Sequence, residues 1–129
     1  MSCSNIVVNA LKYILENDDL EISSIGVFFS KDYFQVVNGK KISFNDFISH
    51  IKLLRKSLTD LNVTILSIAE HGENVHTHHM IKANKMDGSI IEFEVFSRFS
   101  VSEKKIRCCY ELTRKIMGNE DDDDLGFRS

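Results

Sequence analysis

The spacing of apolar residues changes midway along the chain, from a helical period to the alternation of a β-strand. In residues 5–16 the apolar positions recur about every four residues, which predicts an amphipathic helix. Residues 20–29 show a weaker pattern that includes Gly26, and they predict a short second helix. A third helix begins after Ser43, and its apolar stripe continues to Leu61.

Short polar residues mark where these helices begin and where the chain turns. Ser4 is placed to cap the first helix. Ser43, with Asp46 three residues later, has the spacing of a capping box at the start of the third. Between the second and third helices, Asn38 and Gly39 predict a tight turn, because both residues tolerate positive φ.

The second half of the chain alternates apolar and polar positions in four consecutive segments, each of which predicts a strand. The predicted strands cover residues 62–70, 74–84, 89–101 and 105–116. Asp87-Gly88 predicts a hairpin turn between the second and third of them. Simple alternation puts Ser67 on the same face as Ile65 in the first strand, and Cys108 on the same face as Ile106 in the last.

Helices followed by an unbroken run of strands indicate an α+β fold. We predict a cone-shaped roll, in which three N-terminal helices pack on a curved, mainly antiparallel four-stranded sheet. Residues 1–117 form a single domain in this interpretation, and residues 118–129 form an acidic C-terminal tail. A curved sheet closed by helices encloses an apolar pocket, from which a function can be argued.

Composition and charge exclude several partners. No apolar run approaches the roughly 18 residues that a membrane span needs, and the N-terminus does not resemble a signal peptide, so we expect no membrane association. The net charge of −3 resides in the acidic tail, and the nearly neutral remainder has no cluster of Lys or Arg, which argues against nucleic acid. Three cysteines, two of them adjacent, predict a reducing compartment and a cytoplasmic location.

Four segments between Ser30 and the C-terminus resemble the nuclear transport factor 2-like superfamily, and within it small bacterial proteins of the SnoaL-like branch. They contain Tyr33 and the Asn38-Gly39 turn, then His79, and finally Glu111. The segments are DYFQVVNGKKISFNDFISHIKLLR, ENVHTHHMIKANKMDGS, IIEFEVFSRFSV and IRCCYELTRKIMGNEDDDDLGFRS.

The resemblance implies a cone with a pocket at its wide end and a homodimer formed through the outer sheet face. The superfamily includes ketosteroid isomerases, epoxide hydrolases, polyketide cyclases and dehydratases, and also binding modules without catalytic activity. A fold shared by so many activities does not by itself assign one. The resemblance implies no cofactor and an unidentified small apolar ligand.

Two residues are candidate catalytic groups. Glu111 lies where enzymes of this fold often place an acid, and a carboxyl group in an apolar pocket has a raised pKa suited to proton transfer. The alternative is a solvated strand residue that pairs with a nearby arginine. His79 falls on an apolar face and titrates near neutral pH, so it is a second acid/base candidate. A buried histidine with a purely structural hydrogen bond is the alternative.

Three more residues are candidates for ligand binding. Tyr33 follows the second helix, near the pocket mouth that the resemblance implies, and its hydroxyl could donate a hydrogen bond to a ligand oxygen. Glu94 and Arg98 share one face of the third strand. They fit either a ligand site in the pocket or ion pairs on the outer sheet face.

The histidine and cysteine clusters have weaker interpretations. His76 and His78 point to one side of their strand, but no third ligand stands at a fixed spacing, so we predict no metal site. Cys108 and Cys109 lack an adjacent base that would activate a thiolate.

Two functions therefore remain open. The first is a cofactor-independent isomerase, cyclase, dehydratase or hydrolase that acts by proton transfer on an apolar, oxygen-bearing metabolite. The second is a non-catalytic ligand-binding module or dimeric scaffold.

Overall fold

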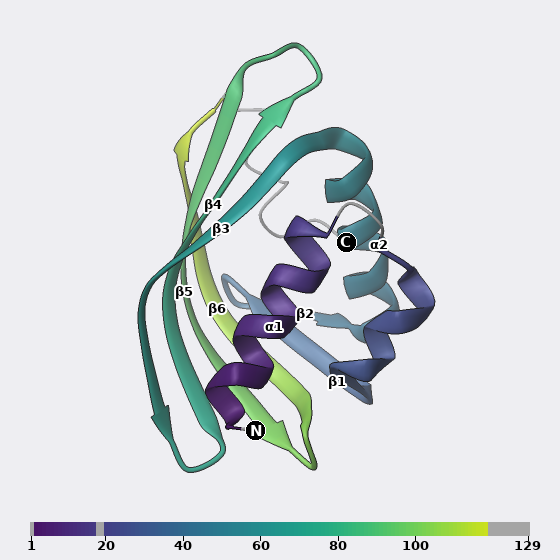
Figure 1. Cartoon of the computed structure of the whole chain (residues 1–129), viewed down its shortest axis with the longest axis vertical. Helices are drawn as coiled ribbons and strands as arrows, with labels where there is room; N and C mark the ends of the chain where they lie inside the picture. Colours follow the sequence, from purple (N-terminus) through teal and green to yellow (C-terminus); the bar gives the residue numbers. More distant parts are fainter. Residues whose placement is uncertain (1, 18–19, 119–129) are drawn as a thin grey trace.

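The computed structural model describes residues 2–17 and 20–118 of the chain. Within these residues, two α-helices and one 3₁₀ helix accompany six strands (Figure 1). In chain order the elements are α1 (Cys3–Glu16), the 3₁₀ helix η1 (Ile22–Val27), β1 (Phe29–Val37), β2 (Lys40–Ser43), α2 (Phe44–Ser57), β3 (Leu58–His71), β4 (Asn74–Lys85), β5 (Ile90–Ser102) and β6 (Lys105–Met117).

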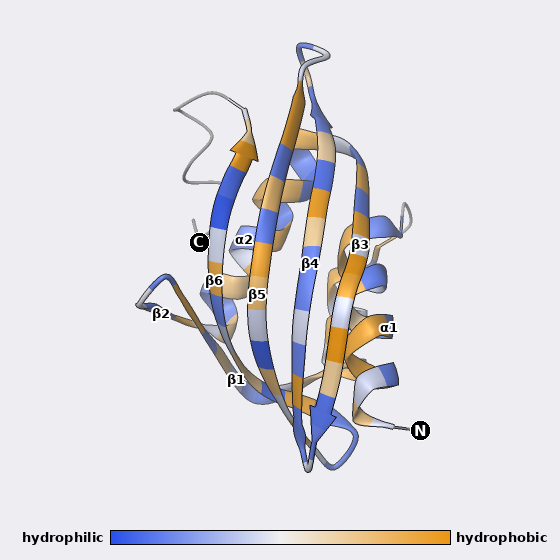
Figure 2. Cartoon of the chain, turned by 90° about the vertical axis from the view of Figure 1, so that its left-hand side faces the viewer, coloured by the Kyte–Doolittle hydropathy of each residue, from blue (hydrophilic) through white to orange (hydrophobic). Residues whose placement is uncertain are grey.

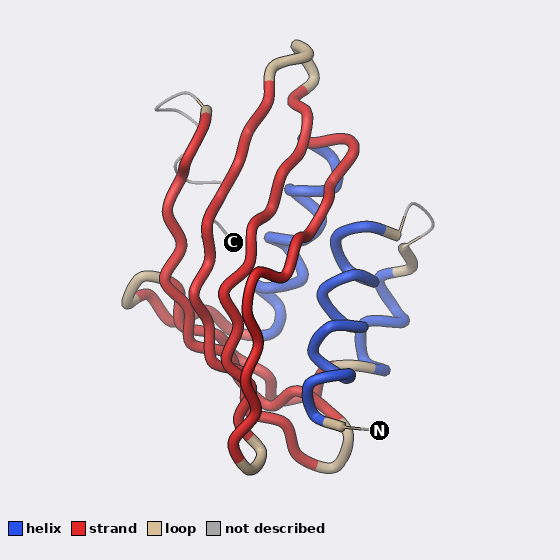
Figure 3. The backbone as a smooth tube through the Cα atoms, turned by 60° about the vertical axis from the view of Figure 1, so that its left-hand side comes forward, coloured by secondary structure: helices blue, strands red, loops and turns tan. Residues whose placement is uncertain are grey.

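The strands form one mixed sheet in the order β2-β1-β6-β5-β4-β3. All neighbours are antiparallel except β1 and β6, which are parallel. The long strands β3–β6 curve around the helices, and both α-helices lie on the same side of the sheet (Figures 1 and 3). We call the helix-covered side the concave face and the opposite side the convex face. The predicted α+β roll is thus present, with a larger sheet.

The prediction of four strands is wrong because it misses β1 and β2. Phe29 and the residues after it extend into a strand, although the sequence pattern places the end of a helix there. The second helix is correspondingly reduced to the six residues of η1, in keeping with the poor helix propensity of Gly26 and its β-branched neighbours. The predicted turn is present: Asn38 and Gly39 have φ values of 50° and 85° and join β1 to β2.

The helix boundaries follow from their caps. Ser2, rather than the predicted Ser4, caps α1, and its hydroxyl oxygen accepts a hydrogen bond from the Asn5 N–H at 3.1 Å. The predicted cap of α2 is confirmed, because the Ser43 hydroxyl oxygen accepts from the Asp46 N–H at 3.2 Å. The α2 helix stops at Ser57, and the remainder of its predicted apolar stripe belongs to β3.

A bulge in β3 reverses the expected faces of that strand. Ile65 pairs with His79 and Ser67 pairs with His78, so Leu66 is an extra residue between two ladder positions. An extra residue shifts the following side chains to the other side of the sheet. Ser67 therefore faces the convex side, although simple alternation puts it with Ile65.

A second bulge has the same effect in β6. Val101 pairs with Ile106 and Ser100 pairs with Cys108, which leaves Arg107 as the extra residue. Ile106 is buried beneath the helices, whereas Cys108 faces the convex side. Simple alternation wrongly assigns them to one face.

In β5, by contrast, alternation is regular and the prediction is confirmed. Hydrophobic and hydrophilic bands alternate along much of β5 (Figure 2). Its odd-numbered residues are buried, and its even-numbered residues are partly or fully exposed. The buried set comprises Ile91, Phe93, Val95, Ser97, Phe99 and Val101. Ile91, Phe93, Phe99 and Val101 belong to one hydrophobic cluster with the apolar face of α1.

Two further sequence expectations concern the C-terminal tail and membrane-spanning segments. The acidic tail predicted for residues 118–129 lies outside the described residues, apart from Gly118. None of the helices in the described residues combines the length and apolar character needed to cross a membrane.

Candidate functional site

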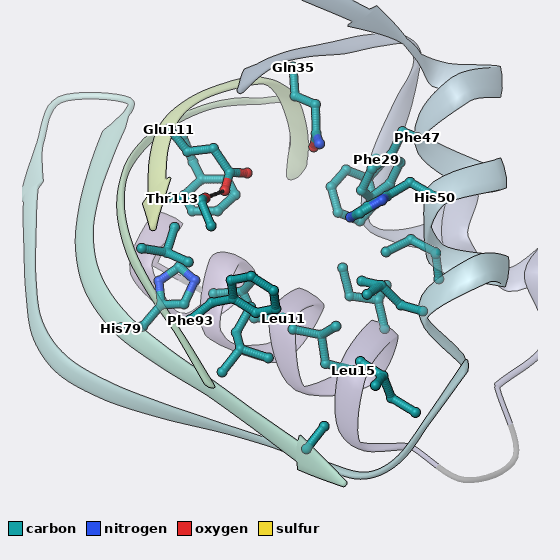
Figure 4. A pocket seen from close by; sticks show the side chains of 18 of the residues that line it. Leu11, Leu15, Phe29, Gln35, Phe47, His50, His79, Phe93, Glu111 and Thr113 are labelled. Atoms are coloured by element: carbon teal, nitrogen blue, oxygen red, sulfur yellow. Dashed lines mark hydrogen bonds between the residues drawn. The ribbon is translucent and has the colours of Figure 1, made fainter. Parts of the chain in front are cut away.

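A cavity of about 80 Å³ lies between the concave face and the two α-helices (Figure 4). One water molecule needs about 10–15 Å³ on such a scale, so the cavity has room for several waters or one compact molecule. Most of the lining side chains are aliphatic or aromatic. The polar exceptions are Tyr33, Gln35, His50, His79, Glu111 and Thr113.

Glu111 reaches this cavity from β6 (Figure 4). Burial of its carboxyl group raises the pKa of Glu111 to about 7, and a hydrogen bond from the Thr113 hydroxyl only partly opposes this shift. The Thr113 Oγ1 donates to the Glu111 Oε2 at 2.6 Å. Near neutral pH the carboxyl group is therefore present in both protonation states, as an acid/base catalyst requires.

His79 on β4 lines the same cavity and is only 2% exposed. Burial lowers the pKa of His79 to about 4, with a smaller contribution from the neighbouring His78, so the ring is neutral at pH 7. Its Nδ1 lies 2.9 Å from the Thr77 hydroxyl, which also contacts the Ser97 hydroxyl. Both catalytic candidates thus face the cavity, Glu111 as a titrating group and His79 as a neutral one.

Tyr33 is buried beside the cavity, and its hydroxyl is already engaged. It donates a hydrogen bond to the Gln35 Oε1 at 2.7 Å. Burial raises the pKa of Tyr33 well above its ordinary value, with smaller contributions from Cys109 and Glu111, so the phenol stays protonated. Tyr33, which was predicted to contact a ligand, therefore holds the side chain of Gln35, which faces the cavity.

Sequence reasoning missed Gln35 and His50. Gln35 is two residues after Tyr33, on the same face of a strand that was not predicted. His50 lies between Phe47 and Ile51 on the buried side of α2, and its side chain faces the cavity from the wall opposite Glu111 (Figure 4). Its helical spacing, three residues after Phe47, was the available signal.

Glu94 and Arg98 lie on the convex face, outside the cavity, because they occupy even-numbered positions of β5. Glu94 accepts hydrogen bonds from the His78 Nε2 and the Arg114 Nε, each at 2.7 Å. The Arg98 guanidinium lies 4.8 Å from the centre of the Tyr110 ring. Glu94 is therefore ion-paired on the outer sheet face, whereas Arg98 contacts an aromatic ring there.

The remaining histidines and cysteines form no evident reactive centre. Within residues 2–17 and 20–118, no three His, Cys, Asp or Glu side chains are grouped to hold a metal ion. Burial raises the pKa of the Cys109 thiol well above its usual range, which opposes thiolate formation.

Comparisons with known proteins agree with this architecture. No family model matches the chain. The uncharacterized protein C11D3.04c of Schizosaccharomyces pombe is 31% identical over 106 residues, which cover 82% of each chain. This relative is fungal, whereas the sequence resemblance points to bacterial proteins.

Solved structures share the fold at low sequence identity. IdmH, a putative polyketide cyclase from Streptomyces antibioticus, superposes with a TM-score of 0.74 at 12% identity, over 88% of this chain and 92% of that one. A SnoaL-like polyketide cyclase from Agrobacterium tumefaciens gives a TM-score of 0.71 at 13% identity, over 90% and 94%. The chain therefore has the fold of the SnoaL-like polyketide cyclases, which agrees with the resemblance in its sequence, and it belongs to the same family as the fission yeast protein.

Proposed function

We propose that the protein binds a small, mostly apolar, oxygen-bearing molecule inside the cone and exchanges a proton with it through Glu111. The observation that carries this proposal is a carboxyl group that faces a mostly apolar cavity and has a pKa of about 7. Such a group can act as general base or general acid at neutral pH without a cofactor. The reaction class is an isomerisation, cyclisation, dehydration or hydrolysis.

The cavity lining supports an uncharged ligand. Among the described residues, no Lys or Arg lines the cavity, so the carboxylate of a ligand would find no counter-charge from them. His79 is neutral at pH 7 and is suited to hydrogen bonding with a polar group of the ligand. The solved neighbours named as polyketide cyclases fit a substrate of this kind.

Native mass spectrometry of the purified protein is the first test. An added small mass that disappears on denaturation would identify the ligand class and supply substrates to assay. Glu111→Gln should then lower turnover by about 10²–10⁴-fold, because the proton-transfer group is lost. Ligand affinity should change by less than about tenfold, or 1.4 kcal/mol.

Glu94→Gln is the matched control, since it makes the same chemical change on the convex face. It should retain turnover. Full activity in Glu111→Gln would remove Glu111 from the mechanism.

The second candidate is a dimeric binding or scaffold module. We infer a homodimer through the convex face because Phe96, Tyr110 and Leu112 are all exposed there. An exposed apolar patch on a sheet commonly marks a protein interface.

Multi-angle light scattering tests the dimer. Leu112→Lys should convert dimers to monomers, because it places a charge within the apolar patch. Val27→Lys should not, although Val27 is equally exposed, because it lies on η1. A monomeric wild type would contradict the proposed dimer. A dimer in which native mass spectrometry finds no added small mass would favour the scaffold over the enzyme.

A further inference from the structure

Gln35 presents to the cavity an amide N–H group that no described residue satisfies. The residue is 5% exposed, and the end of its side chain points into the cavity (Figure 4). Its Oε1 accepts the hydrogen bond from Tyr33. Within residues 2–17 and 20–118, its Nε2 has no hydrogen-bond partner. An enclosed N–H group of this kind is costly unless a ligand or water accepts its hydrogen bond.

Tyr33 determines which end of the Gln35 amide faces the cavity. The Tyr33 side chain is 2% exposed, and Gln35 is its hydrogen-bond partner at 2.7 Å. The phenol carries a proton that needs an acceptor, and only the oxygen of the amide can accept it. The reversed amide would leave that buried proton unsatisfied. The Nε2 group is therefore the end that is directed at the cavity.

Gln35 and Glu111 lie on adjacent strands and face the same space. In the β1–β6 ladder Gln35 pairs with Cys109, and Glu111 is two residues further along β6. Both side chains line the cavity, so the amide donor and the titrating carboxyl group reach one space from adjacent strands.

We propose that the Gln35 Nε2 binds an acceptor oxygen of the ligand, such as a carbonyl oxygen, and that Tyr33 is the positioning residue that orients this donor. The inference rests on the proposed function, because it concerns the same ligand on which Glu111 acts. It defines the ligand class as an uncharged molecule with an acceptor oxygen for Gln35 and an atom that exchanges a proton with Glu111. A ligand of equal shape without that oxygen loses the contact.

Gln35 is the only glutamine in the chain, so its side-chain amide can be observed alone. Protein made with glutamine labelled with ¹⁵N at the side-chain amide gives a single NH₂ signal pair by NMR. Cyclopentanone and methylenecyclopentane are suitable probes, because they have the same ring and differ in C=O against C=CH₂. Shifts of backbone amides around the cavity, from uniformly labelled protein, report the binding of either probe.

Cyclopentanone should move one Gln35 amide proton downfield, whereas methylenecyclopentane should not, although both probes enter the cavity. If the ketone enters and the Gln35 signals respond no more than they do to the alkene, the amide is not the donor, and the ligand-binding cavity still stands. If neither probe perturbs the cavity amides, the proposed function fails and this inference fails with it.

Tyr33→Phe tests the positioning role. Without the hydroxyl, the amide has no group that fixes its orientation, and the ketone-induced shift should fall by at least half while the probes still enter the cavity. An unchanged shift in a folded variant would exclude Tyr33 from orienting Gln35.

Discussion

The two faces of one sheet give the same residue types opposite properties. His78 and His79 are neighbours in β4, yet His78 contacts Glu94 on the convex face, whereas His79 is buried on the concave face. Glu94 and Glu111 show the same contrast. Hydrogen bonds from His78 and Arg114 lower the pKa of Glu94, whereas burial raises the pKa of Glu111 to about 7.

The difference teaches that desolvation without a counter-charge, rather than residue type, creates the candidate chemistry. On the convex face water and basic neighbours stabilise the ionised carboxylate. On the concave face the carboxyl group meets apolar side chains, and the neighbours that contribute to its pKa include no cation. The same substitution should therefore change the pH dependence of stability differently on the two faces.

The largest effect is expected for Glu111→Gln. The folded-state pKa of about 7 exceeds the ordinary 4.5, so the folded protein binds more protons than the unfolded chain between these values. Stability from this group is present at low pH and lost as the pH rises toward 7. Between pH 5 and 8, the free energy of unfolding of Glu111→Gln, measured with urea, should rise by about 2–3 kcal/mol relative to that of the wild type.

Glu94→Gln is the control for this comparison. The pKa of Glu94 is lowered, so its contribution has the opposite sign, and the variant should not gain on the wild type as the pH rises. An equal gain in both variants would show that the two faces do not differ in their electrostatics.

A smaller effect is expected for His79→Asn. The pKa of His79 falls from 6.5 to about 4, so the unfolded chain binds more protons between these values. The stability from neutral His79 is present above pH 6.5 and lost as the pH falls toward 4. Between pH 6 and 5, the free energy of unfolding of the wild type, measured with urea, should fall by about 1.2 kcal/mol relative to that of His79→Asn.

His78→Asn, the control, retains buried His79 and should show most of the wild-type loss, reduced only by the smaller contribution of His78 to the lowered pKa of His79. In the wild type, His79 makes stability rise with pH and Glu111 makes it fall with pH between about pH 4.5 and 6.5, so the two contributions partly cancel. A variant of either residue should therefore expose the pH dependence of the other. A flat profile in both Glu111→Gln and His79→Asn would contradict both pKa shifts.

Much of this arrangement can be predicted from residue patterns. Regular alternation in β5 identifies the buried residues and could have excluded Glu94 and Arg98 from the cavity, since both occupy even-numbered positions. The faces of β3 and β6 cannot be predicted in this way, because the bulges at Leu66 and Arg107 are defined only by pairing with neighbouring strands. Gln35 was missed because β1 is stabilised by its position beside β6, which local propensity does not reveal.

By itself, the sequence determined α1, α2 and the order of the four long strands, together with the Asn38-Gly39 and Asp87-Gly88 turns, since these depend on local periodicity and residue chemistry. His79 became a candidate from its place on an apolar face, and Glu111 from the family resemblance. Only the tertiary structure decided which titratable groups lose water and which polar atoms meet. It joined β1 to β6, and so brought the amide of Gln35 and the carboxyl group of Glu111 to one cavity. Burial and pairing depend on contacts between distant segments, and those contacts set the pKa values on which the proposed chemistry depends.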